Sequence, residues 1–96
     1  IHITSKRNFD CFQDTELDML LKRTLNVKNI IICGVNTDTC VYGTTFGASN
    51  RGYNPIVIEC CTGSMRGEDQ HITALKIMSQ SIAWVMKKEE ILNKLN

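Results

Sequence analysis

One cysteine of this 96-residue chain stands where a nucleophile could be activated. Cys40 lies in the segment GVNTDTCVYGTTFGASNRGY (34–53), which directly follows the β-branched run at 30–32. If a strand ends at the start of this segment and Thr37 or Asp38 caps a following helix, Cys40 falls in the first helical turn. The N–H groups of that turn have no intrahelical acceptor and the helix end is partially positive, so a thiolate is favoured and the free amides can hold an oxyanion.

The alternative interpretation of this thiol is structural. Small residues follow it in the predicted helix, among them Gly43, Thr44, Gly47 and Ala48, as expected where a helix packs closely on a sheet. Because a free cysteine is also a frequent core residue, spacing alone leaves a packing role and a nucleophilic role equally open.

Short apolar runs alternate with segments of helical periodicity along the chain. Residues 28–34 and 55–59 are continuously apolar or nearly so, which is typical of parallel strands that are buried on both faces. A further short strand is expected over 83–86, and a strand end is expected over 1–4. Residues 62–67 are expected to be a loop.

Helices are expected in the intervening segments, at about 15–24, 37–50, 68–82 and 88–95. Asp14 or Thr15 can cap the first helix, Gly52 fits the position after the second, and Glu68 and Asp69 suit the start of the third. The apolar faces of the last two helices are expected to point inward; they consist of Ile72, Leu75, Met78, Ile82, Ile91, Leu92 and Leu95.

This alternation predicts an α/β fold with a parallel, Rossmann-like sheet in a three-layer α/β/α arrangement. A sheet of this kind usually carries about five or six strands with helices on both faces. The sequence accounts for about three or four strands, so it corresponds to the second half of a doubly wound domain.

Composition argues against several functional classes. The chain is 43% hydrophobic and 22% charged with a net charge of +1, which indicates neither a nucleic-acid partner nor a membrane partner. Its apolar runs are too short to span a membrane, and the polar start IHITSKR lacks the apolar core of a signal peptide. Neither GxGxxG nor GxxxxGK[ST] occurs, so nucleotide binding is not indicated.

The cysteines favour a reduced, cytoplasmic chain. There are five, an odd number, and none is paired with CxxC spacing, so a disulfide framework or a zinc knuckle is not expected. Cys60 and Cys61 are adjacent at a strand end, where alternation predicts side chains on opposite faces. His71 lies near a helix start and is interpreted as a packing residue, because no spacing supports a dyad with Cys40.

Three motifs in this order resemble the cysteine hydrolases of the isochorismatase-like superfamily, which includes nicotinamidases, N-carbamoylsarcosine amidases and ureido or biuret hydrolases. The first is the strand followed by Gly34-Val35-Asn36-Thr37-Asp38-Thr39-Cys40-Val41, with Arg51-Gly52-Tyr53 downstream. The second is Lys6 ahead of Phe12, Thr15 and Leu17, and the third is ECCTGSM (59–65) followed by His71, Ala74 and Leu75. The resemblance covers essentially the whole chain.

The resemblance implies roles for three residues. The nucleophile maps onto Cys40 and the catalytic lysine onto Lys6, which would keep the thiol ionised. The backbone N–H groups of Asn36 and Cys40 would form the oxyanion hole, with a cis peptide between Val35 and Asn36. The implied reaction is hydrolysis of a linear C–N bond in a small amide, carbamoyl or ureido compound through a Cys thioester. Members that cleave a vinyl ether lack the cysteine, so Cys40 favours C–N hydrolysis.

The resemblance also implies that the chain is incomplete as a catalyst. The family's triad includes an aspartate from an N-terminal half that this sequence does not contain. The metal-binding Asp and His residues of the nicotinamidase branch also belong to that half. We therefore interpret residues 1–96 as the C-terminal half of a single isochorismatase-like domain. We expect no cofactor or metal on its own residues, a companion chain that supplies the other half, and a homo-oligomer. The loop 63–67 is the candidate pocket or interface segment, and the alternative function is a non-catalytic α/β module or assembly subunit.

Overall fold

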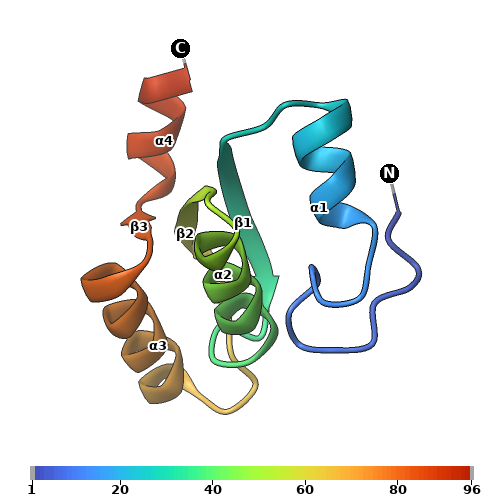
Figure 1. Cartoon of the computed structure of the whole chain (residues 1–96). Coiled ribbons are helices and arrows are strands. Elements are labelled where there is room, and N and C mark those ends of the chain that lie inside the picture. The colour runs from blue at the N-terminus through green and yellow to red at the C-terminus, as the bar shows by residue number, and fades with distance from the viewer. Residues whose placement is uncertain (1, 96) are drawn as a thin grey trace.

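The computed structural model describes residues 2–95 (Figure 1). An N-terminal segment leads into a short helical stretch made of α1 (Leu17–Met19) and the π-helical η1 (Leu20–Thr24). The remaining elements alternate in the predicted way and are β1 (Asn29–Val35), α2 (Cys40–Asn50), β2 (Asn54–Gly63), α3 (Glu68–Ser81), β3 (Trp84–Met86) and α4 (Lys88–Leu95). No helix in residues 2–95 combines the length and the apolar composition that a membrane crossing requires.

The three strands form one parallel sheet in the order β1–β2–β3, which confirms the predicted α/β class. α2 connects β1 to β2 and packs on both, while α3 connects β2 to β3 and packs on these two strands and on α2. In Figure 1 the N-terminal segment and α1 lie beyond β1, whereas α3, β3 and α4 lie on the other side of α2. β1 is therefore an edge of the sheet.

The register of the sheet sorts the strand side chains into two faces. Ile32 pairs with Val57, and both are buried in the core under α2 and α3. Ile31 is aligned through Ile56 with Trp84 on the opposite face, where Ile31 is 46% and Trp84 is 66% exposed. The prediction that the first long strand is buried on both faces is therefore wrong, because in residues 2–95 no full helical layer covers this second face.

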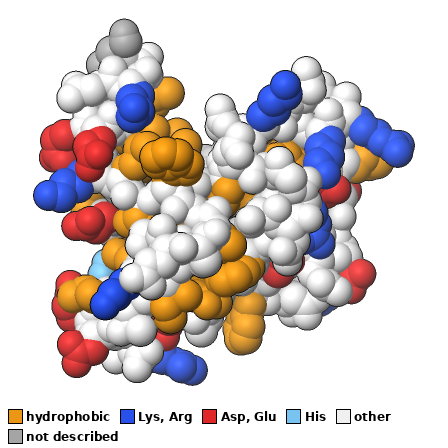
Figure 2. Space-filling view, turned by 60° about the vertical axis from the view of Figure 1, so that its left-hand side comes forward, with side chains coloured by type: hydrophobic (Ala, Val, Ile, Leu, Met, Phe, Trp, Pro, Cys, Tyr) orange, Lys and Arg blue, Asp and Glu red, His pale blue; other side chains and the backbone are white. Residues whose placement is uncertain are grey.

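α4 contacts β2, and its Ile91 is buried outside the main core cluster. Leu92 and Leu95 were expected to point inward with Ile91, but they are 50% and 67% exposed. Figure 2 shows hydrophobic side chains exposed beside α4 and below it. An exposed apolar surface of this kind is typical of a protein interface.

The core lies between α2, α3 and the sheet. It consists of Phe12, Ile32, Val41, Ala48, Tyr53, Val57, Ala74, Leu75 and Met78. Phe12 ties the N-terminal segment to the body, because its ring stacks on Tyr53 with the ring centroids 5.6 Å apart. In α3 the buried positions include His71 and Ala74, so the inward face is rotated from the predicted one and Ile72 is 54% exposed.

Helix boundaries agree with the sequence-based prediction in the second half and differ in the first. α3 and α4 begin at residues 68 and 88 as predicted, and Gly52 follows α2 with a φ of +89°. α2 begins at Cys40 with Thr39 as its N-cap, because the residues before it form a turn. The N-cap of α1 is Glu16, although the Thr15 hydroxyl accepts a hydrogen bond from the Leu17 N–H at 3.3 Å.

Residues 2–4 form no strand, contrary to the predicted strand end, and Ile1 lies outside the described residues. β2 is longer than predicted and irregular, since β1 advances from Ile32 to Gly34 while β2 advances from Val57 to Thr62. The irregularity overturns the expectation for Cys60 and Cys61. Their side chains do not lie on opposite faces, because the two sulfur atoms are 4.0 Å apart and both side chains are exposed.

Candidate active site around Cys40

Cys40 is the first residue of α2 and stands at the carboxyl end of β1, as the sequence predicted. The chain reaches it through Gly34, whose φ of +124° is a conformation that glycine adopts without strain. The peptide between Val35 and Asn36 is cis, as the resemblance implied. The half-buried Cys40 lines a hollow of about 180 Å³ together with Cys11 and Cys33, so the thiol is accessible at the edge where open α/β sheets bind ligands.

The turn between β1 and α2 leaves two backbone amides unused. The Asn36 carbonyl oxygen accepts hydrogen bonds from the N–H groups of Thr39 (3.1 Å) and Val41 (3.0 Å), which closes the turn on itself. The N–H groups of Asn36 and Cys40 donate to no protein acceptor in the described part of the chain. Free amides beside a thiol at a helix N-terminus are suited to hold a developing negative charge.

The loop that follows β2 is fastened to this turn. The Met65 N–H donates to Oδ1 of Asn36 at 3.0 Å, and the Ser64 hydroxyl donates to Oδ1 of Asp38 at 2.7 Å. Oδ2 of Asp38 is buried and accepts no hydrogen bond within residues 2–95, while Nε of Arg66 lies 3.8 Å away. The candidate pocket segment 63–67 therefore borders the site.

A buried side-chain contact between Thr37 and His71 joins the turn before α2 to α3. The Thr37 hydroxyl and Nδ1 of His71 are 2.7 Å apart, and the Thr37 N–H donates to the Gly63 carbonyl at 2.9 Å. His71 is not among the residues that line the hollow at Cys40. The imidazole thus fills the packing role that the sequence favoured over a dyad with Cys40.

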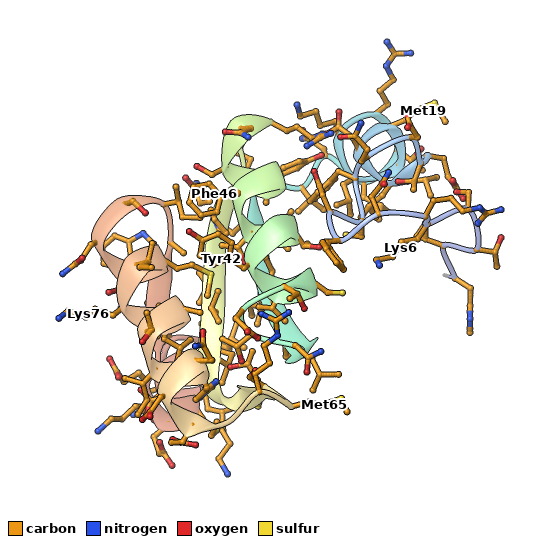
Figure 3. All side chains as sticks on the ribbon, turned by 90° about the horizontal axis from the view of Figure 1, so that it is seen from below. Lys6, Met19, Tyr42, Phe46, Met65 and Lys76 are labelled. Atoms are coloured by element: carbon orange, nitrogen blue, oxygen red, sulfur yellow. The ribbon has the colours of Figure 1, made fainter. Side chains whose placement is uncertain are left out.

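Lys6 lies on the N-terminal segment, in a different part of the chain from the other two predicted site residues. It is exposed on the N-terminal segment, it does not line the hollow at Cys40, and its ammonium group makes no ion pair in the described part of the chain. Figure 3 shows Lys6 on this segment and Met65 at the tip of the loop after β2, away from one another. The structure brings Asn36 and Cys40 together at the start of α2, whereas Lys6 lies on the N-terminal segment and does not line the hollow.

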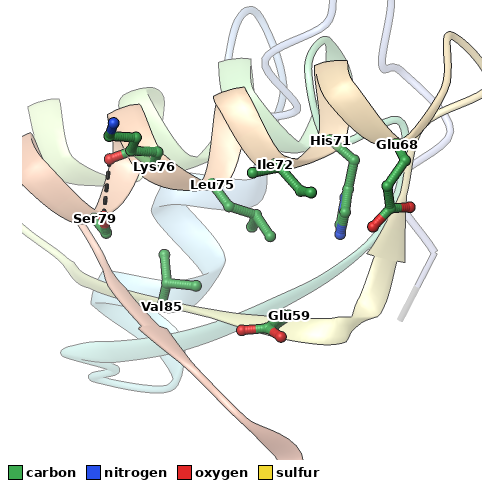
Figure 4. Close-up of a pocket in the computed structure, with 8 residues that line it drawn as sticks. All are labelled: Glu59, Glu68, His71, Ile72, Leu75, Lys76, Ser79 and Val85. Atoms are coloured by element: carbon green, nitrogen blue, oxygen red, sulfur yellow. Dashed lines mark hydrogen bonds between the residues drawn. The ribbon is translucent and has the colours of Figure 1, made fainter.

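A larger hollow of about 550 Å³ lies elsewhere, between α3 and the strands (Figure 4). Ile72, Leu75 and Val85 give it apolar walls, and Glu59 and Glu68 lie at its margin. Figure 4 shows the His71 ring extending from α3 toward β2 at one end of it. We place the candidate site at Cys40 instead, because no cysteine lines this hollow.

Residues 2–95 do not contain a set of side chains that could hold the metal of the nicotinamidase branch. Within residues 2–95 no group of three or more His, Cys, Asp or Glu side chains is arranged to hold a metal ion. The side chains of residues 2–95 therefore do not by themselves form a metal centre.

Sequence reasoning missed the part that Asp38 plays in fastening the loop. Its only local signal is a short acidic side chain between a strand and a helix, which is also the signal of an N-cap. Its partners Ser64 and Arg66 lie beyond the next strand, so only the folded chain reveals the contact.

Comparison with known proteins gives a consistent result. The model of the isochorismatase domain matches residues 1–90. The uncharacterized isochorismatase family protein YecD of Escherichia coli O157:H7 is 32% identical over 90 residues, which are 94% of this chain and 47% of that protein.

Two solved structures share the fold. An isochorismatase-like hydrolase from Alkaliphilus metalliredigens has a TM-score of 0.88 and 27% identity, covering 95% of this chain and 49% of that one. The nicotinamidase SaPncA from Staphylococcus aureus has a TM-score of 0.80 and 35% identity, covering 85% and 50%. The chain thus spans about half the length of the relatives that it matches.

Proposed function

The chain belongs to the isochorismatase family, and on that premise we propose that it supplies the nucleophile of a hydrolase for linear C–N bonds. The proposed substrate is a small molecule with an amide, carbamoyl or ureido group. The observation that carries the proposal is the accessible thiol of Cys40 at the start of α2, beside the unused amides of Asn36 and Cys40. Similarity to a nicotinamidase supports an amide as the reacting group.

In the proposed reaction Sγ of Cys40 attacks the carbonyl carbon of the substrate. Negative charge develops on the carbonyl oxygen, where the N–H groups of Asn36 and Cys40 stabilise it. The C–N bond breaks as the nitrogen takes up a proton, which leaves a thioester on Cys40. Water then hydrolyses the thioester to the acid and regenerates the thiol.

Two further groups complete this mechanism. Lys6 is proposed to stabilise the thiolate of Cys40 through its ammonium group. The proton for the leaving nitrogen is proposed to come from an aspartate outside this chain.

We propose that residues 1–96 form the C-terminal half of one domain and that a companion polypeptide supplies the remainder. The open edge of β1 supports this, because an unpaired strand edge pairs readily with another strand. The exposed Ile31, Val35 and Trp84 support it as well, since they would be covered by the missing helical layer. A homo-oligomer of the completed domain in the cytoplasm is proposed with it.

The alternative function is a non-catalytic α/β module or assembly subunit. The observation that favours it is that the exposed Lys6 does not line the hollow at Cys40. Native and then denaturing mass spectrometry of the purified protein is the first test of the companion. A second polypeptide of similar size supports the hydrolase, and its absence favours the non-catalytic module.

Competitive alkylation tests the nucleophile itself. Cys33, Cys60 and Cys61 are exposed, whereas Cys40 is half-buried. Accessibility alone therefore predicts that Cys40 is labelled more slowly than these three cysteines. An activated Cys40 reacts with iodoacetamide near neutral pH faster than all of them, as peptide mass spectrometry would show. Cys11 is the matched control, since it is also half-buried and lines the same hollow. Labelling of Cys40 at or below the rate of Cys11 would overturn the proposal.

The reaction class is tested by ammonia release from small primary amides and ureido compounds. The Cys40→Ala variant is expected to lose the activity, whereas Cys11→Ala retains it. Activity that survives in Cys40→Ala would show that another group carries the reaction.

A further inference from the structure

Cys60 and Cys61 form an exposed pair of adjacent thiols near the carboxyl end of β2. Their Sγ atoms are 4.0 Å apart and both side chains are exposed. The proposed hydrolase mechanism uses neither of them. They also lie outside the hollow that contains Cys40.

The irregularity in β2 produces this arrangement. In a regular strand two adjacent side chains point to opposite faces. Here β2 leaves the register between Val57 and Thr62, and the Thr62 hydroxyl donates to the carbonyl oxygens of Ile58 (3.4 Å) and Glu59 (3.1 Å). The backbone around the two cysteines is thereby bent, so that both sulfur atoms come to the same side.

We propose that Cys60 and Cys61 together form a chelating site for soft, thiophilic electrophiles that take two sulfur ligands, the chemical class being monosubstituted trivalent arsenicals. Two bonds of about 2.3 Å that meet at one pyramidal atom near a right angle, as at trivalent arsenic, hold their sulfur atoms about 3.3 Å apart. The observed 4.0 Å must therefore shorten by less than about 1 Å on binding. Little movement of either side chain is needed.

The chemistry of the step balances without an oxidant. The hydrated reagent carries two As–OH groups, and each is exchanged for an As–S bond. The two thiol protons leave with the two hydroxide groups as two water molecules, and arsenic remains trivalent. The product is a ring that contains arsenic, both sulfur atoms and the backbone between the two cysteines.

The surroundings favour a ligand that needs two sulfurs over an ion that needs four. Structural zinc is held by four side chains, and within residues 2–95 no third or fourth His, Cys, Asp or Glu completes a metal site. The hydrogen bond with Cys60 raises the pKa of the Cys61 thiol, and Lys88 acts in the opposite direction. Cys61 is therefore protonated at neutral pH, which slows its alkylation but supplies the proton that leaves in the condensation.

Intact-mass spectrometry with phenylarsine oxide tests the site. The purified protein, with any polypeptide that copurifies, is reduced, freed of reductant and treated with one equivalent. We expect one phenylarsenic group per chain, the loss of two titratable thiols, and an adduct that maps to the peptide containing Cys60 and Cys61. Removal of the adduct should require a dithiol, because a monothiol must displace two linked sulfurs.

Single substitutions separate chelation from ordinary thiol reactivity. In Cys60→Ser and Cys61→Ser the adduct should be displaced by glutathione on the order of a hundredfold more readily than in the parent protein, because the second attachment is lost. Cys33→Ser and Cys40→Ser should behave like the parent, so the result is independent of the proposed hydrolase. Circular dichroism verifies that each variant is folded. An adduct that maps to another pair, no adduct at all, or unchanged stability in Cys60→Ser and Cys61→Ser would overturn the proposal.

Discussion

The hydroxyl of Thr37 lies 2.7 Å from Nδ1 of His71, and the two side chains are 0% and 9% exposed. This contact joins the turn before α2 to the first part of α3. It therefore links the backbone that carries Cys40 to an element that begins almost thirty residues further along the chain. An interior polar pair of this kind contributes to stability only while both partners are present.

The Thr37→Val substitution keeps the shape of the side chain but leaves a ring nitrogen of His71 buried without its partner. We expect the free energy of unfolding to fall by about 1–3 kcal/mol. Thr45→Val is the matched control, because Thr45 is equally buried but its hydroxyl donates to the Val41 carbonyl of its own helix at 2.7 Å. That carbonyl keeps its helical N–H donor, so the loss should be smaller. Urea denaturation followed by circular dichroism measures both, and equal losses would contradict the assigned role of Thr37.

The Asp38→Ala substitution should release the loop after β2, since it removes the acceptor for the Ser64 hydroxyl. Losing a bond worth about 1–1.5 kcal/mol predicts hydrogen exchange roughly tenfold faster at the amides of Met65 and Arg66. Arg66→Ala is the control, because its side chain is 70% exposed and its pairing with Asp38 is long, at 3.8 Å. Exchange rates that rise equally in both variants would show that charge, and not the Ser64 bond, holds the loop.

Gly47 of α2 faces the carboxylate of Asp10, and a Cβ at this position would overlap it. Asp10 is held in place by Arg51 at 3.2 Å and by the N–H of Phe12 at 2.9 Å. We therefore expect Gly47→Ala to destabilise the protein by about 1–2 kcal/mol, although alanine is the better helix former.

The double variant with Asp10→Ala isolates this clash. In the Asp10→Ala background the same Gly47→Ala change should be neutral or stabilising by up to about 1 kcal/mol, because only the helix propensity remains. Thermal denaturation of the four proteins in this cycle gives the coupling. A Gly47→Ala effect of the same size in both backgrounds would contradict the contact.

Tyr53 gives the protein a dependence on alkaline pH. Burial and the hydrogen bond that its hydroxyl donates to Asp18 at 2.7 Å raise the pKa of Tyr53 from 10.0 to about 12. Below the unfolded pKa of 10.0 the phenol is protonated in both states and its contribution is present in full. Between that value and 12 the unfolded chain loses the proton that the folded chain keeps, so the free energy of unfolding falls as the pH rises.

The Tyr53→Phe variant tests this dependence. It should lose about 1 kcal/mol near neutral pH, because the bond to Asp18 is gone. From pH of about 9 to about 11 it should then lose less stability than the parent protein, since no phenol titrates at this position. Urea titrations at the two pH values give the comparison. Parallel losses in both proteins would assign the alkaline transition to other groups.

The sequence by itself determined the order of the elements and the place of Cys40. The apolar run before Gly34, the small residues after Cys40 and the acidic pair at Glu68 and Asp69 are local signals, and local signals fix where strands and helices begin. The start of α3 and the whole span of α4 were predictable for this reason. The α/β class followed from the alternation alone.

Tertiary structure decided which side chains meet. Cys60 and Cys61 face the same side because pairing with β1 breaks at Val57, and a register break is invisible to a strand's own alternation. Ile31 and Trp84 are exposed because no layer of residues 2–95 fully covers their face, although their strands are as apolar as buried ones. Contacts between segments far apart in the chain depend on packing and register, whereas a short stretch of sequence encodes only its own backbone preferences.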